Sequence, residues 1–503
     1  MSEAVTPVPN VPAPKSFAVD KLADFSDRLS PMLVKELRQG LRAKTFVVVF
    51  LTLQVLLGFV LLASLGASSS PQDAGHSISG VIFMFFSIAV LVIQPMRGIG
   101  SLHTELKSNT MELMVLTRLS AWRIVLGKWI ALVSQSALLL AAIVPYLILR
   151  YWFGDMNLFG ELILLLLIFL GSALATAITV GLSAVPSMII RGLLPLVGGV
   201  FLIFTSIVMS FGRGFQELVE LCSMQDADSR WIFLIMILSG LYVGWTILGL
   251  GASMIAPAAE NHSTLRRIVT FAALLIAILI ALLADLDTEI TASLALIICI
   301  PAIVMALSEP FHPLPPICHP FVKRGLPGKI AGRFLYPGWP SGFIFALLAS
   351  GLGLFLCLAG TGGPRFREEE VSFIAGLLGT LIMPAALLGF AGDRIKNRFA
   401  AYLLIVVSSL ILTFLMLMVS QAMPSSSRGF LWLFSWLPMV NMFLSEISSF
   451  NDKTVAIVSI AVSSIYSVML LIFSLKAFRQ QREVEDVCQS ISLGEEQTQA
   501  SEP

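Results

Sequence analysis

The sequence predicts an all-α, polytopic membrane protein, a transmembrane helical bundle of about twelve spans with both termini in the cytoplasm. Two features of the composition support this fold class: 57% of the 503 residues are hydrophobic and only 13% are charged. The mean hydropathy is +0.89, whereas soluble domains carry roughly 25% charged residues. In addition, long apolar runs recur along the chain, each near the 20 or so residues with which a helix crosses the hydrocarbon core.

The apolar runs define the predicted spans. They cover residues 45–67, 78–96, 129–149, 161–184, 192–211, 231–256, 268–284, 290–307, 341–359, 371–391, 399–420 and 454–475. A thirteenth apolar segment, 430–448, contains Trp432, Trp436 and Pro438. These residues are typical of the membrane interface and of broken helices, so we expect an interfacial or re-entrant helix on the outer face.

The distribution of basic residues predicts the orientation. With the N-terminus in the cytoplasm, few of the 32 Lys and Arg residues fall outside: Arg150, Arg213, Arg230, Arg365, Arg367, Arg428 and Lys453. This is the bias of the positive-inside rule. A full crossing by 430–448 would instead carry Lys476, Arg479 and Arg482 outside, which is a further reason to expect that it does not cross.

Residues 1–29 form a Pro-rich polar tail, which we expect to be disordered. The tail lacks the apolar core of a signal peptide, so the first span is expected to act as an uncleaved signal anchor. We divide the rest into a six-span domain at 30–256, a second six-span region at 257–475 and a cytoplasmic tail at 476–503. Long loops at corresponding places suggest a degenerate internal repeat, although the loop at 308–340 is rich in Pro and Gly rather than helical.

The segment before the first span, 30–44, predicts an amphipathic helix. Ser30 can cap it and Pro31 suits its first turn. Leu33, Leu37 and Leu41 repeat every four residues, and Lys35, Arg38 and Arg42 occupy other faces. We expect this helix to lie in the cytoplasmic membrane interface. The alternative is a solvated juxtamembrane helix anchored through its charges.

Several chemistries find no support in the sequence. The string GLPGKIAG at 325–332 has the wrong glycine spacing for a phosphate-binding loop, so this chain is not expected to be an ATPase or other enzyme. The five cysteines are scattered, and the spacing of His312, Cys318 and His319 fits no standard metal site. We expect no bound cofactor or metal. No basic patch suggests nucleic acid.

Ionisable residues are confined to the ends of the predicted spans, as for Glu161, Arg191, Asp285 and Asp393. Ion-driven transporters and intramembrane enzymes usually keep ionisable groups at the middle of the membrane. The absence of such groups from the middle of the predicted spans argues against both classes. Gln54, Gln94 and Gln135 are expected to form hydrogen bonds between helices.

Two acidic runs fall on the predicted outer face. One is the triple acid Glu368–Glu370, and the other is the turn with Asp285, Asp287 and Glu289. We interpret both as solvated.

The spans offer no charged cavity, which favours a lipid-like or amphiphilic cargo.

The cytoplasmic loop at 97–128 stands out because it is polar between two spans. Five basic residues lie in it, namely Arg97, Lys107, Arg118, Arg123 and Lys128. Met111, Met114 and Val115 have the i, i+3, i+4 spacing of a short helix with one apolar face. We expect the loop to fold against another surface.

The string ELKSNTMELMVLTRLSAWRIVLGK in this loop resembles the second-to-third-span loop of ABC-2-type transporter permeases. The positions in step are Glu105, Thr110, Glu112, Leu113, Thr117, Leu119, Ser120, Gly127 and Lys128. Asn109 stands where Gly is usual and Arg118 where Pro is usual; Asn tolerates left-handed backbone nearly as well as Gly. The string LVKELRQGLRAK resembles that family's interfacial helix. Together the resemblance covers residues 30 to about 256.

The resemblance implies that the loop docks on a separate ATPase, present in two copies, which uses ATP and Mg²⁺. Met111 and Met114 would supply adaptable apolar contacts, Thr110 a helix cap, and Glu105 and Glu112 ion pairs with the partner. The coupling set is Glu105, Asn109, Thr110, Met111, Glu112, Leu113, Met114, Thr117, Leu119 and Ser120. The alternative is a self-contained loop packed on its own bundle.

These features predict the permease subunit of an ABC exporter in a bacterial inner membrane. Its partners would be the ATPase subunits, membrane lipid and, if the halves are not a fused pair, a second permease. Two alternatives remain open: an ion-gradient-driven secondary transporter, and a membrane scaffold or assembly protein that transports nothing.

Overall fold

The computed structural model describes most of the chain. The described residues are 31–67, 71–107, 120–151, 157–210, 213–257, 260–361, 367–392, 395, 397–444, 447 and 450–500. Within them the fold is helical, with an isolated β-bridge between Asp287 and Thr361. The all-α fold class is therefore confirmed, whereas the N-terminal tail at 1–29 lies outside the described residues.

Twelve helices in the described part of the chain are long and apolar enough to cross a membrane, which matches the predicted spans. The first-half helices are α1 (Pro31–Leu41), α2 (Lys44–Ala67), α3 (Pro71–Ser87), α4 (Gln94–Met96), α5 (Ser101–Lys107), α7 (Ala121–Tyr151), α8 (Leu158–Leu182), α9 (Leu194–Ser210), α10 (Arg213–Cys222) and α11 (Ala227–Ile255). Single turns of π-helix interrupt two of these spans, η2 (Ile88–Ile93) before α4 and η3 (Ile189–Leu193) before α9.

The second half begins with α12 (Ser263–Ala284) and α13 (Thr288–Ser308). It continues with α14 (Pro315–Val322), α15 (Gly325–Leu335), α16 (Trp339–Leu358), α17 (Glu368–Ala391), α18 (Arg398–Ala422), the 3₁₀ segment η5 (Ser425–Phe434), α19 (Pro438–Leu444) and α20 (Asp452–Ala500). The thirteenth apolar segment therefore does not span. It is broken into η5 and the short α19, and α19 packs against α17 and α20.

One expectation about the second half was wrong. The loop at 308–340 is helical despite its Pro and Gly residues, because Pro315 and Pro316 occupy the first turn of α14, where proline is tolerated. Gly325, at φ +71°, makes the break between α14 and α15. The predicted cytoplasmic tail after 475 begins as a continuation of the last span, since α20 runs on to Ala500, and its side of the membrane stays a prediction. Its extension packs against α14.

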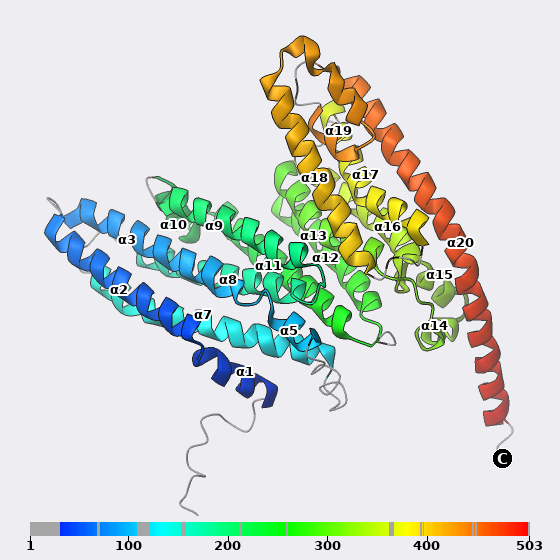
Figure 1. Cartoon of the computed structure of the whole chain (residues 1–503), viewed down its shortest axis with the longest axis horizontal. Helices are drawn as coiled ribbons and strands as arrows, with labels where there is room; N and C mark the ends of the chain where they lie inside the picture. Colours follow the sequence, from blue (N-terminus) through cyan, green and yellow to red (C-terminus); the bar gives the residue numbers. More distant parts are fainter. Residues whose placement is uncertain are drawn as a thin grey trace, which may run out of the picture.

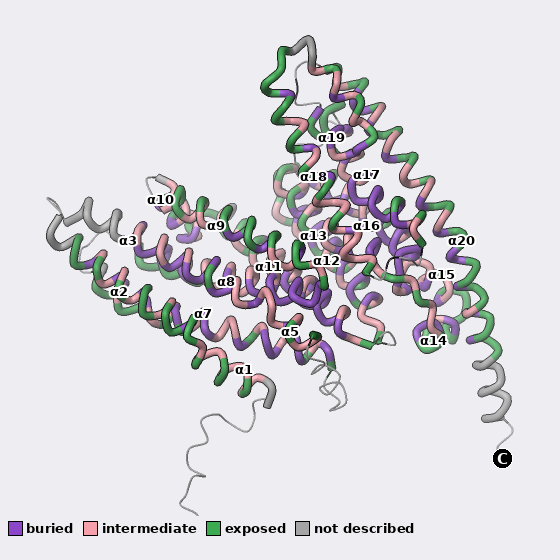
Figure 2. The backbone as a smooth tube through the Cα atoms, viewed as in Figure 1, coloured by how far each residue is buried: buried purple, intermediate pink, exposed green. Residues whose placement is uncertain are grey.

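The helices form two groups, α1–α11 and α12–α20, that lie at an angle to each other (Figure 1). The end of the first group that carries α10 lies far from the end of the second group that carries α19. Helix α1 and the far end of α20 both lie on the lower side of the view (Figure 1). Each group has its own buried core, visible as purple helix faces in Figure 2.

The groups join through α11 and through a small apolar cluster. Tyr242 of α11 shares a hydrogen bond of 2.9 Å with Thr270 of α12 and donates one of 3.1 Å to the carbonyl of Ile298 in α13. Ile190 of η3 and Met305 of α13 belong to the joining cluster.

Some corresponding spans of the two halves pack in similar pairs, whereas others differ: α7 packs closely on α8, but α16 makes little contact with α17. The fourth and sixth spans of each half are neighbours, α8 with α11 and α17 with α20. The short segment before the last span also packs on the fourth in both halves, α10 on α8 and α19 on α17. These pairings are what an internal repeat would produce, and the repeat itself stays a prediction.

Candidate functional site

A buried lysine joins three helices at the base of the 97–128 segment. Lys128, near the start of α7, lies with its Nζ 3.1 Å from Glu36 Oε1 of α1 and 2.8 Å from Glu105 Oε1 of α5. Its side chain is only 6% exposed. A buried charge is tolerated when it is paired, and here one ammonium serves two carboxylates. The base of the segment is therefore fixed to both the helix before the first span and the third span.

A second set of polar contacts lies beside this lysine. Arg97, just after α4, donates to Gln94 Oε1 at 3.2 Å and to the side-chain oxygen of Gln135 in α7. Gln94 Nε2 also donates to Gln135 Oε1 at 2.9 Å. Arg97 Nη2 reaches the carbonyl of Gly40 in α1 at 3.4 Å. The predicted interhelical role of Gln94 and Gln135 is thus confirmed.

Gly40 permits this close approach. A Cβ atom at this position would collide with the side-chain amide of Gln135. A side chain at position 40 would therefore displace the Gln135 amide from its place beside Arg97 and Gln94. The third glutamine, Gln54, donates to the carbonyl of Ala142 at 3.4 Å, which confirms its interhelical role as well.

The predicted amphipathic helix is present as α1. Leu33, Leu37 and Leu41 are half-buried, whereas Lys35, Arg38 and Arg42 are exposed. The helix packs against α7, and Leu41 contacts the core of the first half. Its apolar face is therefore covered at least partly by protein, and its placement in a membrane interface remains a prediction.

The predicted coupling residues are mostly outside the described residues. This holds for Asn109, Thr110, Met111, Glu112, Leu113, Met114, Thr117 and Leu119. Ser120 is described and exposed, directly before α7. Glu105 was expected to pair with a partner, but within this chain its carboxylate is already paired with Lys128.

Sequence reasoning missed Glu36 and did not assign Lys128 a structural role. The only available signal was that Lys128 lies between apolar residues in IVLGKWIALV, where a lysine without a partner would be costly. No local pattern could name Glu36 as the partner, because the two residues are 92 positions apart.

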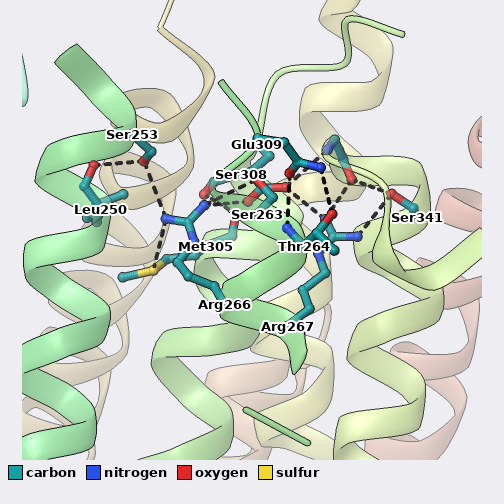
Figure 3. Close-up of polar contacts among 12 residues, drawn as sticks. Leu250, Ser253, Ser263, Thr264, Arg266, Arg267, Met305, Ser308, Glu309 and Ser341 are labelled. Atoms are coloured by element: carbon teal, nitrogen blue, oxygen red, sulfur yellow. Dashed lines mark hydrogen bonds and ion pairs between the residues drawn. The ribbon is translucent and has the colours of Figure 1, made fainter. Parts of the chain in front are cut away.

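A larger ionic cluster lies at the corresponding end of the second half (Figure 3). Glu309, which follows α13, accepts from Arg266 Nη2 at 2.6 Å and from Arg267 Nη2 at 2.8 Å. It also accepts from the backbone N–H of Gly338 at 3.0 Å. Burial alone would raise the pKa of the Glu309 carboxyl, but Arg267 and Arg266 hold that pKa below its ordinary value.

Arg267 also fixes the turn before α16. Its Nη1 donates to the carbonyls of Phe334 and Tyr336 at 2.9 and 2.6 Å and to Ser341 Oγ at 3.0 Å. Its Nη2 donates to the carbonyl of Gly338 at 3.1 Å. The planar guanidinium suits this fan of acceptors. The cluster therefore holds together the start of α12, the end of α13 and the turn that leads into α16.

In the sequence, Arg266 and Arg267 served only as evidence for the bias of basic residues towards the cytoplasm. Glu309 was not singled out as a candidate site residue. The signal that could have found Glu309 is its place directly after an apolar span, in ALSEPF. Glu105 lies at the end of the second span of the first half, and Glu309 directly follows the second span of the second half, so each half has a partly buried carboxylate at this place. The basic residues that pair with these carboxylates come from different places. Lys128 lies near the start of the third span of the first half, whereas Arg267 lies near the start of the first span of the second half.

Each half also contains a cavity. The first, of about 440 Å³, lies between α3, η2, α8 and α9 and is lined mainly by apolar side chains. The second, of about 420 Å³, lies between α13, α16 and α17. Within the described ranges no cluster of three or more His, Cys, Asp or Glu side chains could hold a metal ion.

No protein-family model, curated protein or solved structure matches this chain. The composition and the twelve apolar helices found among the described residues define an integral membrane protein of the helical-bundle class.

Proposed function

We propose that this chain is the membrane-spanning permease subunit of an ABC-type exporter, driven by two copies of a separate ATPase. The observation that carries the proposal is the Lys128 junction. Because Lys128 pairs with both Glu36 and Glu105, a push on the 97–128 segment acts on α5, α1 and α7 together. That is the mechanical property a permease needs if ATP is hydrolysed on another chain.

The distribution of charge supports the same proposal. Ionisable residues in the described spans lie near helix ends, as Lys128, Arg191 and Arg398 do. An energy source outside the membrane then accounts for transport without a mid-depth ion relay. ATP and Mg²⁺ would be used by the partner, in a bacterial inner membrane with both termini of this chain in the cytoplasm. The pathway would be lined by this chain alone if the halves act as a pair, or with a second permease.

The direct experiment measures ATPase stimulation by the purified permease. Reversal of Glu112 to Lys, combined with Met111→Ala and Met114→Ala, should abolish stimulation of the ATPase that co-purifies with the chain. Arg123→Ala, at an exposed position of α7, should leave stimulation intact. Unchanged stimulation in the triple variant would sink the docking proposal.

One observation favours the ion-gradient alternative. Glu161, in the first turn of α8, is only 3% exposed, and Ser79 Oγ donates to its carboxylate at 3.3 Å. A buried carboxylate in a span can carry a proton. Glu161→Gln separates the two functions: an ion-driven transporter would lose flux, whereas the ATP-driven one would keep it.

A further inference from the structure

The cavity of the second half combines an apolar interior with an acidic mouth. Its inner wall includes Leu296, Ile300 and Ile303 of α13 and Leu377 of α17. At one end it is lined by Glu289, in the first turn of α13, and by Glu369 and Glu370, in the first turn of α17. The sequence suggested that the two acidic runs were simply solvated. In the structure, residues of both runs line the same end of this cavity.

The three carboxylates at the mouth are exposed, and no ion pair within the described part of the chain engages them. Each of the two helix N-termini contributes only about half a positive charge, and Arg367 adds one more. In the same two segments Asp285, Asp287 and Glu368 add further negative charge and Arg365 adds positive charge, so acidic residues outnumber basic ones by six to two. The mouth therefore carries net negative charge, and a cation would be attracted to it.

An aromatic residue of the lining follows the acidic residues along α17. Phe373 lines the cavity one helical turn after Glu369 on the same helix, so the two share a face. A ring face attracts quaternary and primary ammonium groups. Moving inward, the lining changes from carboxylate to aromatic to aliphatic, in the order of an ammonium head followed by a hydrocarbon tail.

The cavity of the first half provides the contrast. It has nearly the same volume and an apolar lining, but none of its described lining residues is ionisable. An uncharged acyl chain would suit either cavity equally. Of these two cavities, the one between α13, α16 and α17 distinguishes a positively charged amphiphile from a neutral one.

We propose that this second-half cavity is a binding site for cationic amphiphiles, with the ammonium group at Glu289, Glu369 and Glu370 and the alkyl chain between α13 and α17. The inference concerns binding at equilibrium and does not depend on the proposed ATP-driven transport. An ordinary membrane phospholipid is the competing occupant, and it would show no preference for positive charge.

The cavity contains its own reporter. Cys357, half-buried at the end of α16, lines it together with Cys299. The experiment follows maleimide alkylation of Cys357 by mass spectrometry, with the purified full chain in nanodiscs of zwitterionic lipid. Dodecyltrimethylammonium, below its micellar concentration, should protect Cys357 at a concentration about tenfold lower than dodecyl maltoside, an uncharged amphiphile of equal chain length. Added salt should weaken this preference because the mouth is exposed.

Substitutions localise the effect. Glu369→Gln with Glu370→Gln should remove most of the preference for the cation. The matched control is Glu368→Gln with Asp287→Asn, which removes the same charge from the same end at positions that do not line the cavity; the preference should remain. Equal protection by both amphiphiles, or an equal loss of preference in both double variants, would overturn the proposal in favour of lipid filling or general surface attraction.

Discussion

Lys128 and Glu36 are 92 residues apart in the sequence, yet their charged atoms lie 3.1 Å apart in a region where the lysine is almost fully buried. This contact fastens the helix before the first span to the base of the third span. Together with the Lys128–Glu105 ion pair, it links the 97–128 segment directly to α1 and α7.

Lys128→Met should destabilise the protein by about 3–5 kcal/mol, because two partly buried carboxylates lose their cation. Thermal unfolding in detergent would measure this. Arg123→Met removes an exposed cation from the same helix and should have little effect. Similar melting temperatures for the two variants would mean that the Lys128 ion pairs contribute nothing.

Arg267→Lys should also destabilise, by about 3 kcal/mol, although it keeps the charge. A lysine cannot reach the carbonyls of Phe334, Tyr336 and Gly338 and the Glu309 carboxylate at once. Arg324→Lys, an exchange at an exposed site, is the control for thermal unfolding. If both exchanges were tolerated equally, the fan of hydrogen bonds would not be a source of stability.

The Glu309 carboxylate predicts a specific pH dependence. Its pKa in the folded protein lies below the ordinary value of 4.5, so its contribution to stability is fully present above pH 4.5. That contribution is lost as the pH falls through the folded-state pKa. Glu309→Gln should therefore be less stable than the native protein at pH 7, with a gap that narrows below pH 4.5. The test is to measure the free energy of unfolding of both proteins across this pH range. A difference between them that stayed constant would contradict the lowered pKa of Glu309.

Two glycines of α16 offer a matched pair. A Cβ at Gly342 would collide with the carbonyl oxygen of Ala306 in α13, whereas nothing lies within 4 Å of one at Gly351. Gly342→Ala should cost about 1–3 kcal/mol by forcing α13 and α16 apart. Gly351→Ala should be neutral or stabilise by up to about 1 kcal/mol. Equal melting temperatures would show that the two helices are not in close contact at residue 342.

The spans could be predicted because a run of about 20 apolar residues is a local property that needs no knowledge of the rest of the chain. The same holds for the break in 430–448 and for the alternation of Leu33 and Lys35 on α1. By contrast, local composition misled at 308–340, where prolines that start α14 and Gly325 between α14 and α15 were taken as signs of irregular structure.

By itself, the sequence determined that this is a helical membrane protein, roughly where its spans lie, and that ionisable groups are kept from the middle of those spans. Only the tertiary structure decided which charges meet. The pairing of Lys128 with Glu36, the enclosure of Glu309 by Arg266 and Arg267, and the gathering of Glu289 with Glu369 at one cavity all join residues far apart in the chain. The periodicity of apolar residues indicates which side chains avoid water. Which charged side chains pair with each other depends on how whole helices pack.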